Sequence, residues 1–215
     1  MLARELSQAY PVALVNSVNP VRLQGQKTAA FEVVDALGEA PDLHVVPVGN
    51  AGNIAAYWLG YGEYRSAGLS SGVPRMWGFQ AEGAAPLVSG HVVSHPETVA
   101  TAIRVGNPAS WKLAVAARDE SGGSVESVTD DQILAAQRSL ASRDGVFVEP
   151  ASAAGAAGLV QAYRRGTLPG GTRVVVTVTG HGLKDTATAL SGVGTLVDEV
   201  GDPDVDAAAA AAGLA

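Results

Sequence analysis

A short run of small and amide residues, Gly49-Asn50-Ala51-Gly52-Asn53, has the composition of a phosphate-binding turn. It follows an apolar run at 43–48 and precedes a segment with helical character that begins at Ile54. Small residues at the end of a strand let the backbone curl around an anion, and the N–H groups at the start of the next helix then point at that anion. The sequence therefore predicts a site that holds a phosphate group as the handle of a larger ligand.

Two common phosphate-binding motifs do not match this turn, and a third motif matches only by accident elsewhere in the chain. The dinucleotide fingerprint G-x-G-x-x-G and the Gly-Lys-Ser/Thr of a Walker loop are both absent. Gly68-Leu69-Ser70-Ser71-Gly72 matches the G-x-S-x-G nucleophile elbow, but here a helix is expected before the serine and a strand after it, the reverse of that elbow. We interpret this match as accidental. A plain strand-to-helix connection remains the alternative interpretation of the turn at 49–53.

Two further segments carry side chains that suit ligand binding. Thr179-Gly180-His181-Gly182 closes the most strongly β-branched run of the chain, and open α/β sheets gather their ligands at the carboxyl ends of strands. Arg22 follows the polar turn Asn16-Ser17-Val18-Asn19-Pro20, where a guanidinium beside serine and asparagine donors suits a second phosphate. Both segments also have simpler interpretations. The glycines at 180 and 182 could only end a strand, and Arg22 could be an ordinary exposed arginine.

The composition excludes several classes of site. There is no cysteine, so disulfides, thiolate nucleophiles and cysteine metal sites are absent, and the four histidines lack metal-ligand spacing. The formal net charge of −7 is spread along the chain, without a basic patch for nucleic acid or for a membrane surface. No apolar stretch reaches the length of a membrane span, and no signal-peptide pattern is visible. We expect a cytoplasmic protein that binds no metal.

The spacing of the apolar residues predicts the framework that positions these segments. Alternating strands and helices predict an α/β fold with a mostly parallel twisted sheet and flanking helices. The run at 174–179 lacks alternation, which predicts a strand buried on both faces. We expect strands at 12–15, 43–48, 76–80, 146–148 and 174–179, and helices at 2–10, 24–37, 54–65, 97–103, 111–119, 129–142 and 153–165.

Taken together, these segments resemble the threonine synthases, pyridoxal-phosphate enzymes of the tryptophan-synthase-β-like fold. The matching stretches follow the order of the family across most of the chain and leave out only the tail. They lie at 14–20, 25–32, 47–53, 75–80, 103–111, 148–153 and 178–185.

The resemblance implies roles for individual residues. Thr179 would face the pyridine nitrogen of the cofactor, and a hydroxyl there makes a weaker electron sink than an aspartate does. Ser17, Arg22 and Asn50 would contact the phosphate of the substrate O-phospho-L-homoserine, which the complete enzyme converts with water into L-threonine and phosphate. The phosphate of pyridoxal phosphate would be held by Gly49, Asn50, Ala51, Gly52 and Asn53.

The resemblance also implies a Schiff-base lysine, carried by an N-terminal segment of the family that has no counterpart in these 215 residues. The three lysines, Lys27, Lys112 and Lys184, do not match it. We therefore expect an N-terminally truncated fold without a catalytic lysine, and no activity of the chain alone. In domain terms, we expect 1–20 to be a remnant of the smaller domain, 21–200 an incomplete cofactor-binding domain and 201–215 a tail.

Two other functions stay open at this point. The chain could be a non-catalytic fragment, or a partner half that binds pyridoxal phosphate weakly and pairs with a missing N-terminal half or forms a homodimer. It could also belong to a dehydratase of the same fold. Ser17 and Arg22 argue against the dehydratase, because such an enzyme has no substrate phosphate to hold.

Overall fold

The fold is described from a computed structural model of the chain, covering residues 2–15, 19–191, 194 and 204–214. The chain divides into two compact units, Met1–Lys184 and Asp185–Ala215. The first unit holds the sheet and, among its described residues, a pocket of about 170 Å³. The second contains the helices α9 (Thr186–Ser191) and α10 (Val205–Ala211). The expected division at residues 20 and 200 stays a prediction.

Four parallel strands form the sheet of the first unit, in the order β3-β2-β1-β4. They are β1 (Leu43–Pro47), β2 (Arg75–Ala81), β3 (Ser124–Val128) and β4 (Val174–Val176). In the register, Val45 of β1 lies opposite Trp77 of β2 on one side and Val176 of β4 on the other. The prediction of an α/β fold with a mostly parallel sheet is therefore confirmed.

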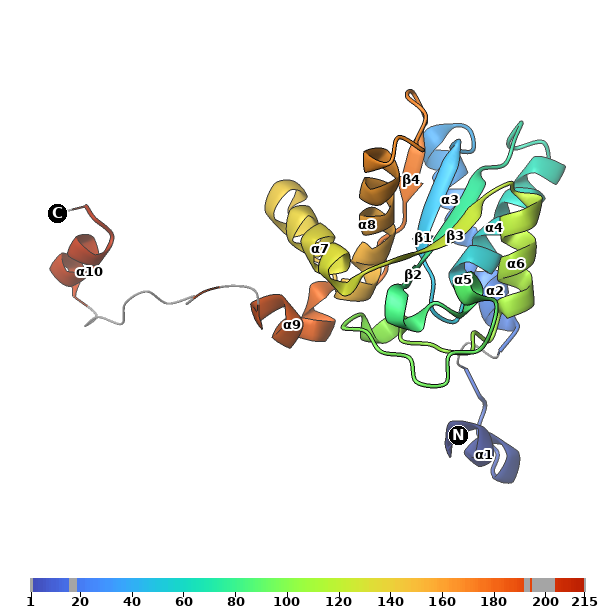
Figure 1. The fold of residues 1–215 in the computed structure, drawn as a ribbon, viewed down its shortest axis with the longest axis horizontal. Coiled ribbons are helices and arrows are strands. Elements are labelled where there is room, and N and C mark those ends of the chain that lie inside the picture. Colours follow the sequence, from blue (N-terminus) through green and yellow to red (C-terminus); the bar gives the residue numbers. More distant parts are fainter. Residues whose placement is uncertain (1, 16–18, 192–193, 195–203, 215) are drawn as a thin grey trace. The chain divides into compact units, whose positions relative to one another are not determined.

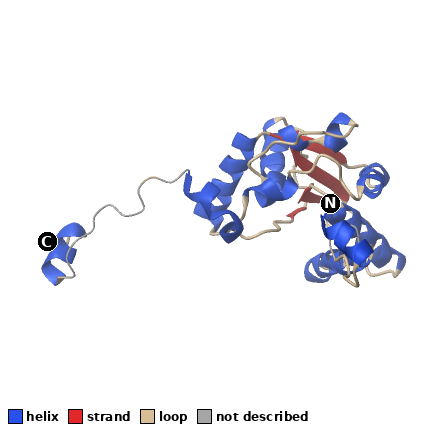
Figure 2. Ribbon diagram, turned by 90° about the horizontal axis from the view of Figure 1, so that it is seen from below, coloured by secondary structure: helices blue, strands red, loops and turns tan. Residues whose placement is uncertain are grey.

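Helices cover both faces of this sheet, with α7 and α8 on one face and α3, α4 and α6 on the other (Figures 1 and 2). The helices of the first unit are α1 (Leu2–Ala9), α2 (Val21–Gln26), α3 (Thr28–Leu37), α4 (Gly52–Ser66), α5 (Pro86–Ser89), α6 (Trp111–Glu120), α7 (Asp130–Asp144) and α8 (Pro150–Arg164). Short 3-10 turns lie at Glu82–Ala84, Thr101–Ile103 and Gly182–Asp185.

Alternate residues of the central strand β1 enter two separate cores. Val45 packs with Phe79 in the core covered by α7 and α8. Val46 packs with Met76 and Ile54 in the core covered by α3, α4 and α6. Both β1 valines are fully buried, as expected for a parallel strand with helices on its two faces.

Several expected elements agree closely with the structure. The helices expected at 2–10, 54–65, 111–119, 129–142 and 153–165 correspond to α1, α4, α6, α7 and α8. At the start of α7, the Gln132 N–H donates to the Thr129 hydroxyl over 3.2 Å, and the Thr129 N–H donates to the Gln132 side chain over 2.9 Å. This capping box satisfies two N–H groups that the helix itself cannot, which explains why the prediction from the sequence succeeded here.

Three expected strands differ from the structure. Residues 12–15 are irregular, because no described strand lies beside them to complete a ladder. Residues 146–148 form no strand, and Val148 makes only an isolated antiparallel bridge with His181. The strand at 174–179 is shorter than expected and only half-buried, because β1 is its single neighbour in the described sheet. The prediction of burial on both faces was therefore wrong.

Two expected helices also differ, and strand β3 was not predicted. The segment 97–103 contains only a 3-10 turn, because the Asp130 carboxylate accepts hydrogen bonds from the Thr98 hydroxyl and from the Val99 N–H at 3.0 Å. The expected helix at 24–37 is divided into α2 and α3 at Lys27. Strand β3 has the sequence Ser-Val-Glu-Ser-Val, and its polar residues gave no strand signal.

Candidate functional site

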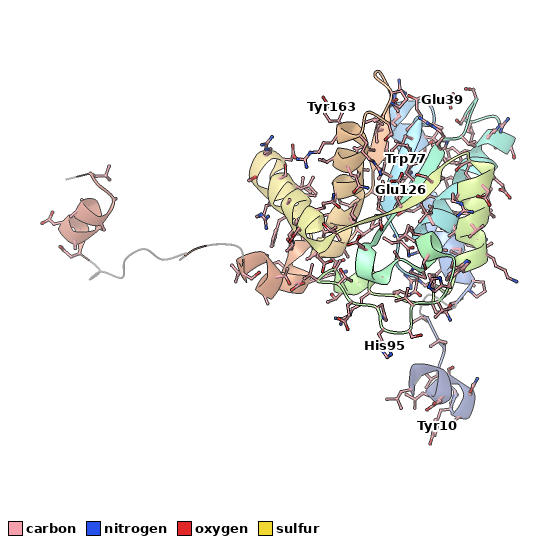
Figure 3. The ribbon with its side chains drawn as sticks, viewed as in Figure 1. Tyr10, Glu39, Trp77, His95, Glu126 and Tyr163 are labelled. Carbon is pink, nitrogen blue, oxygen red and sulfur yellow. The ribbon has the colours of Figure 1, made fainter. Side chains whose placement is uncertain are left out.

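A pocket of about 170 Å³ opens at the end of the sheet where the strands finish. In Figure 3, the label Glu39 marks the side of the sheet on which the strands begin, and the label His95 marks the opposite side. The pocket lies on the side of His95, because its lining includes residues that follow β1 and β4. The lining combines the residues after β1 and β4 with parts of α2, α8 and the 3-10 turn at Thr101–Ile103. It consists of Arg22, Leu23, Gln26, Pro47, Gly49, Asn50, Ala51, Gly52, Asn53, Ala102, Ile103, Ala151 and Thr179.

The turn at 49–53 has the backbone geometry of an anion-binding nest. Ala51 is in the left-handed conformation, with φ 65° and ψ 13°, immediately before the first turn of α4. Among the described residues, no backbone acceptor receives the N–H groups of residues 50–53. Free N–H groups at a helix start, next to a left-handed residue, form a concave site for a phosphate. This turn therefore fits the phosphate group that the sequence predicted.

The side-chain amides of the turn are oriented as donors. The Asn50 carbonyl oxygen Oδ1 accepts the Ala109 N–H at 3.4 Å, and the Asn53 Oδ1 accepts from the Gln26 amide at 3.0 Å. Each carbonyl oxygen is thus engaged by the protein, which leaves the NH₂ group of each side chain to donate. Two NH₂ groups beside a nest of N–H groups add to its affinity for an anion.

Arg22 brings a full positive charge to the same pocket. It lies in α2, and Gln26 of that helix hydrogen-bonds to Asn53 at the start of α4. This bond ties the arginine-bearing helix to the phosphate turn. The structure therefore places Arg22, Asn50 and Thr179 in one pocket, whereas Ser17 lies outside the described residues.

Thr179 is held by a serine that the sequence did not single out. Its hydroxyl oxygen lies 2.8 Å from the hydroxyl oxygen of Ser152 in α8. The Ser152 residue is fully buried. The next residue, Gly180, has no space for a side chain, because an added Cβ would come within 1.9 Å of the Glu149 carboxylate. Thr179 is therefore positioned by α8 as well as by β4.

Other site residues were also absent from the sequence prediction. Ala102 and Ile103 reach the pocket from a loop about fifty residues beyond the phosphate turn, and nothing in the sequence places that loop beside the turn. Gln26 and Ile103 lie inside stretches that resemble the threonine synthases, a signal that could have found them, but neither was singled out as a site residue. Leu23, Pro47 and Ala151 complete the wall.

None of the three lysines belongs to the pocket lining. The Lys27 ammonium lies 2.7 Å from the Glu63 carboxylate and 2.6 Å from the Gln24 side chain. Lys112 is exposed on α6, and Lys184 is exposed in the 3-10 turn at Gly182–Asp185. Among the residues that the structure describes, the pocket lining thus holds no amine that could bond covalently to a bound carbonyl compound.

The serines of the G-x-S-x-G match have a structural role. The hydroxyl of Ser70 donates to the Glu39 carboxylate, and the Ser71 N–H lies 2.9 and 3.0 Å from its two oxygens. Hydrogen bonds from Ser70 first, and then from Ser71 and Ala40, hold the pKa of Glu39 well below its usual range. Neither serine lines the pocket, which agrees with the interpretation of this match as accidental.

Comparison with known proteins assigns the family. The model of the family described as "Pyridoxal-phosphate dependent enzyme" matches residues 1–180. The chain belongs to this family. Its cofactor is the one that the sequence predicted, and the predicted family resemblance is confirmed.

Curated relatives narrow the similarity to the threonine synthases. The chain is 60% identical over 190 residues to the threonine synthase of Mycobacterium bovis, which covers 88% of this chain and 53% of that protein. It is 55% identical over 211 residues to that of Synechocystis, covering 98% of this chain and 55% of the relative. The threonine synthase of Methanocaldococcus jannaschii is 45% identical over 198 residues, 88% of this chain and 49% of the relative. The chain thus spans about half the length of the curated relatives that it matches.

Solved structures show the same fold at low identity. A processed threonine deaminase from Solanum lycopersicum superposes with a TM-score of 0.71 at 20% identity, covering 87% of this chain and 54% of that one. A maize serine racemase gives 0.69 at 20% identity, over 88% of this chain and 57% of that one. These likenesses confirm the predicted fold class and say nothing about the substrate.

The described residues contain neither a membrane-spanning helix nor a metal-binding cluster. No helix there is both long and apolar enough to cross a membrane. In the same part of the chain, no group of three or more His, Asp or Glu side chains is arranged to hold a metal ion.

Proposed function

We propose that these 215 residues form the phosphate-anchoring part of a threonine synthase active site. In the complete enzyme, that site converts O-phospho-L-homoserine and water into L-threonine and phosphate. The observation that carries the proposal is the meeting of two anion-binding features in one pocket, the nest at 49–53 and the guanidinium-bearing Arg22. A cofactor phosphate and a substrate phosphate together need two such features. The 45–60% identity to threonine synthases supports the same assignment.

The residues of the pocket divide between cofactor and substrate. The N–H groups of the nest and the positive end of the α4 dipole bind the cofactor phosphate. The Thr179 hydroxyl hydrogen-bonds to the ring nitrogen. Bound pyridoxal phosphate supplies an electron sink for the amino-bearing carbon of the substrate. Arg22 and the NH₂ group of Asn50 bind the phosphate of O-phospho-L-homoserine, and the arginine fork matches two of its oxygens.

These residues by themselves bind and orient, and we propose that they do not catalyse. Proton transfer at the substrate needs a base within reach of the pocket. None of the three lysines lines the pocket: Lys27 pairs with Glu63, and Lys112 and Lys184 are exposed. The lysine must then come from residues outside these 215. The pocket would be completed by that segment, whether it is joined to this chain or carried by a partner.

A chimera tests the assignment. The matched 190 residues of the Mycobacterium bovis threonine synthase are replaced by the corresponding residues of this chain, and phosphate and L-threonine are measured with O-phospho-L-homoserine as substrate. We expect both products from the chimera, and none from the 215-residue chain with added pyridoxal phosphate. A chimera that folds and holds the cofactor but leaves O-phospho-L-homoserine intact would overturn the proposal.

Substitutions at Arg22 in the same chimera separate a synthase from a dehydratase of the same fold. Arg22→Ala should raise KM for O-phospho-L-homoserine by about 100-fold, because a charge-assisted contact to phosphate is lost. Arg22→Lys keeps the charge and should recover part of this loss. Release of ammonia from L-threonine or L-serine by the chimera, unaffected by Arg22→Ala, would favour the dehydratase instead.

The remaining alternative is a non-catalytic partner half. The 215-residue chain is titrated with pyridoxal phosphate and with inorganic phosphate. Weak binding of both, together with phosphate release from O-phospho-L-homoserine only when the N-terminal part of the Mycobacterium bovis relative is added, would support a partner half. This result would leave the assigned site residues unchanged. It would mean that the lysine-bearing segment is supplied by a separate chain.

A further inference from the structure

Three contacts fasten α2 to α4, the helix that begins at the nest. The Gln26 amide donates to the Asn53 Oδ1 at 3.0 Å, and the Lys27 ammonium lies 2.7 Å from the Glu63 carboxylate. Between these two contacts, the backbone of Lys27 packs against Gly60. Positions 53, 60 and 63 are seven and three residues apart, so they lie on one side of α4.

The contact at Gly60 fixes how near α2 can come to α4. A Cβ added at Gly60 would lie 2.4 Å from the Lys27 carbonyl oxygen and 2.9 Å from the Cβ of Ala30, which is fully buried. Lys27 is the residue at which α2 ends and α3 begins. The junction of these helices can therefore lie at this distance only because residue 60 has no side chain.

The Lys27 ammonium joins the two helices from the other side of this contact. It lies 2.7 Å from the Glu63 carboxylate on α4 and 2.6 Å from the Gln24 Oε1 on α2. Only 16% of the Lys27 side chain is exposed, so this ion pair is less screened by water than a pair on the surface. Helix α2 has six residues, none of them fully buried. Polar contacts to α4 therefore do much of the work of holding it in place.

The position of α2 matters because Arg22 is part of it. Arg22 and Gln26 are four residues apart, which places them on one side of the helix, and both line the pocket. Gln26 is also the residue that bonds to Asn53 in the nest. A movement of α2 along α4 would therefore change the distance between the Arg22 guanidinium and the nest.

We propose that Lys27, together with Gly60 and Glu63, is a positioning residue that fixes the distance between Arg22 and the nest at 49–53. This distance sets the length of the phosphorylated amino acid that the pocket accepts beside the cofactor. The role rests on the proposed function and adds to it the residues that determine substrate length. Two anion sites held at one separation bind tightly only those ligands whose phosphates match it.

The test uses the 215-residue chain and a series of alkane-α,ω-diol bisphosphates with about two to eight carbons. Their Kd values are measured by isothermal titration calorimetry beside that of inorganic phosphate. For the wild type we expect one chain length to bind best, about tenfold tighter than inorganic phosphate, because its second phosphate reaches Arg22 without a second association step. Arg22→Ala should remove this optimum, so that all the bisphosphates bind about as inorganic phosphate does.

Substitutions of the ion pair test the role of Lys27. Lys27→Met keeps the length of the side chain and removes its charge. We expect the best bisphosphate to bind about tenfold more weakly and the preference for one length to flatten, since α2 is no longer held at one place. Lys27→Glu and Glu63→Lys should each have the same effect, and the double variant should restore the wild-type optimum. Lys112→Met, at an exposed lysine of α6, is the matched control and should leave the optimum unchanged.

A substitution at Gly60 tests the backbone contact separately. In Gly60→Ala the new methyl group forces the junction of α2 and α3 away from α4, so we expect the optimum to move to another chain length. Gly62→Ala is the control on the same helix, because its added Cβ would meet nothing within 4 Å. We expect it to keep the wild-type optimum.

Inorganic phosphate separates this role from the proposed function. It needs only the nest, so its Kd should stay within about twofold in every variant of Lys27, Gly60 or Glu63 that folds. Failure of the wild type to bind inorganic phosphate sinks the proposed site and the positioning role with it. The role alone is overturned if phosphate binds but the wild type shows no optimum, or if the optimum is the same in wild type, Lys27→Met and Gly60→Ala.

Discussion

Gly49 packs directly against the backbone of Ile103. A Cβ added at Gly49 would lie 2.9 Å from the Ile103 Cα and 3.1 Å from the Ala102 carbonyl oxygen. The two segments are far apart in the sequence, and both line the pocket. The phosphate turn can therefore reach the 3-10 turn at Thr101–Ile103 only because residue 49 has no side chain.

Gly49→Ala should disrupt this contact. The added methyl meets backbone rather than a flexible side chain, so we expect a loss of about 1–3 kcal/mol in the free energy of unfolding. We also expect at least a tenfold weaker Kd for inorganic phosphate, because the turn must move. Gly62→Ala, inside α4 and outside the pocket lining, is the matched control, since its added Cβ would meet nothing within 4 Å. Equal phosphate Kd values for the two variants would contradict the role of Gly49.

Ala51 carries the backbone strain of the nest. Its φ of 65° is unfavourable for any residue with a Cβ, and it is the one non-glycine residue with a positive φ in the described part of the chain. Ala51→Gly should raise the free energy of unfolding by about 0.5–1 kcal/mol, measured by denaturant titration. Ala116→Gly, inside α6, should lower it by about 1 kcal/mol. If both substitutions lower the free energy of unfolding, the left-handed conformation of Ala51 does not destabilise the fold.

Local signals account for the parts of the site that the sequence could predict. The turn at 49–53 is defined by its own small residues and by the strand and helix on either side of it. Thr179 was found because it ends a β-branched run, and the start of α7 because Thr129 suits an N-cap and two acidic residues, Asp130 and Asp131, follow it. In each case the residues that make the contact are close together in the chain.

Contacts between distant segments account for what the sequence could not predict. The approach of Ile103 to Gly49 and the hold of Ser152 on Thr179 appear only after the chain has folded. The position of β4 at the edge of the described sheet could not be predicted either. Three consecutive valines indicate a strand, but they do not indicate how many strands lie beside it.

His44 makes the stability of the chain depend on pH. It is fully buried in β1, with its ring nitrogens 2.8 Å from the Tyr61 hydroxyl and 2.6 Å from the Thr177 hydroxyl. Burial lowers the pKa of His44 from 6.5 to about 4. The unfolded chain therefore takes up this proton at a higher pH than the folded chain does, and stability falls as the pH is lowered from about 6.5 to about 4.

The expected slope is about 1.4 kcal/mol per pH unit, for a total of roughly 3 kcal/mol. It is measured by urea unfolding at several pH values, as the difference between wild type and His44→Gln. This variant keeps a polar side chain that does not titrate. His91→Gln, at an exposed histidine, should reproduce the pH profile of the wild type. A His44→Gln profile parallel to the wild type between pH 6.5 and 4 would refute the assignment.

Asp130 ties the loop before the 3-10 turn to the start of α7. Its carboxylate accepts from the Thr98 hydroxyl and, at 3.0 Å, from the Val99 N–H, and this loop leads directly to Ala102 and Ile103 in the pocket wall. Asp130→Asn replaces one acceptor oxygen by a donor NH₂ group, so one of the two bonds is lost. We expect a loss of about 1–2 kcal/mol in the free energy of unfolding and a weaker Kd for inorganic phosphate.

Asp131→Asn is the matched control, because it removes the same charge from the first turn of α7. Asp131 is exposed, and its carboxylate makes no hydrogen bond to a described residue. The loss of favourable interaction with the helix dipole, about 0.3–1 kcal/mol, is common to both variants. The difference between them therefore measures the tie to the loop. If both variants bind phosphate with the same affinity and unfold at the same urea concentration, the loop is held by other contacts and Asp130 acts only as a first-turn charge.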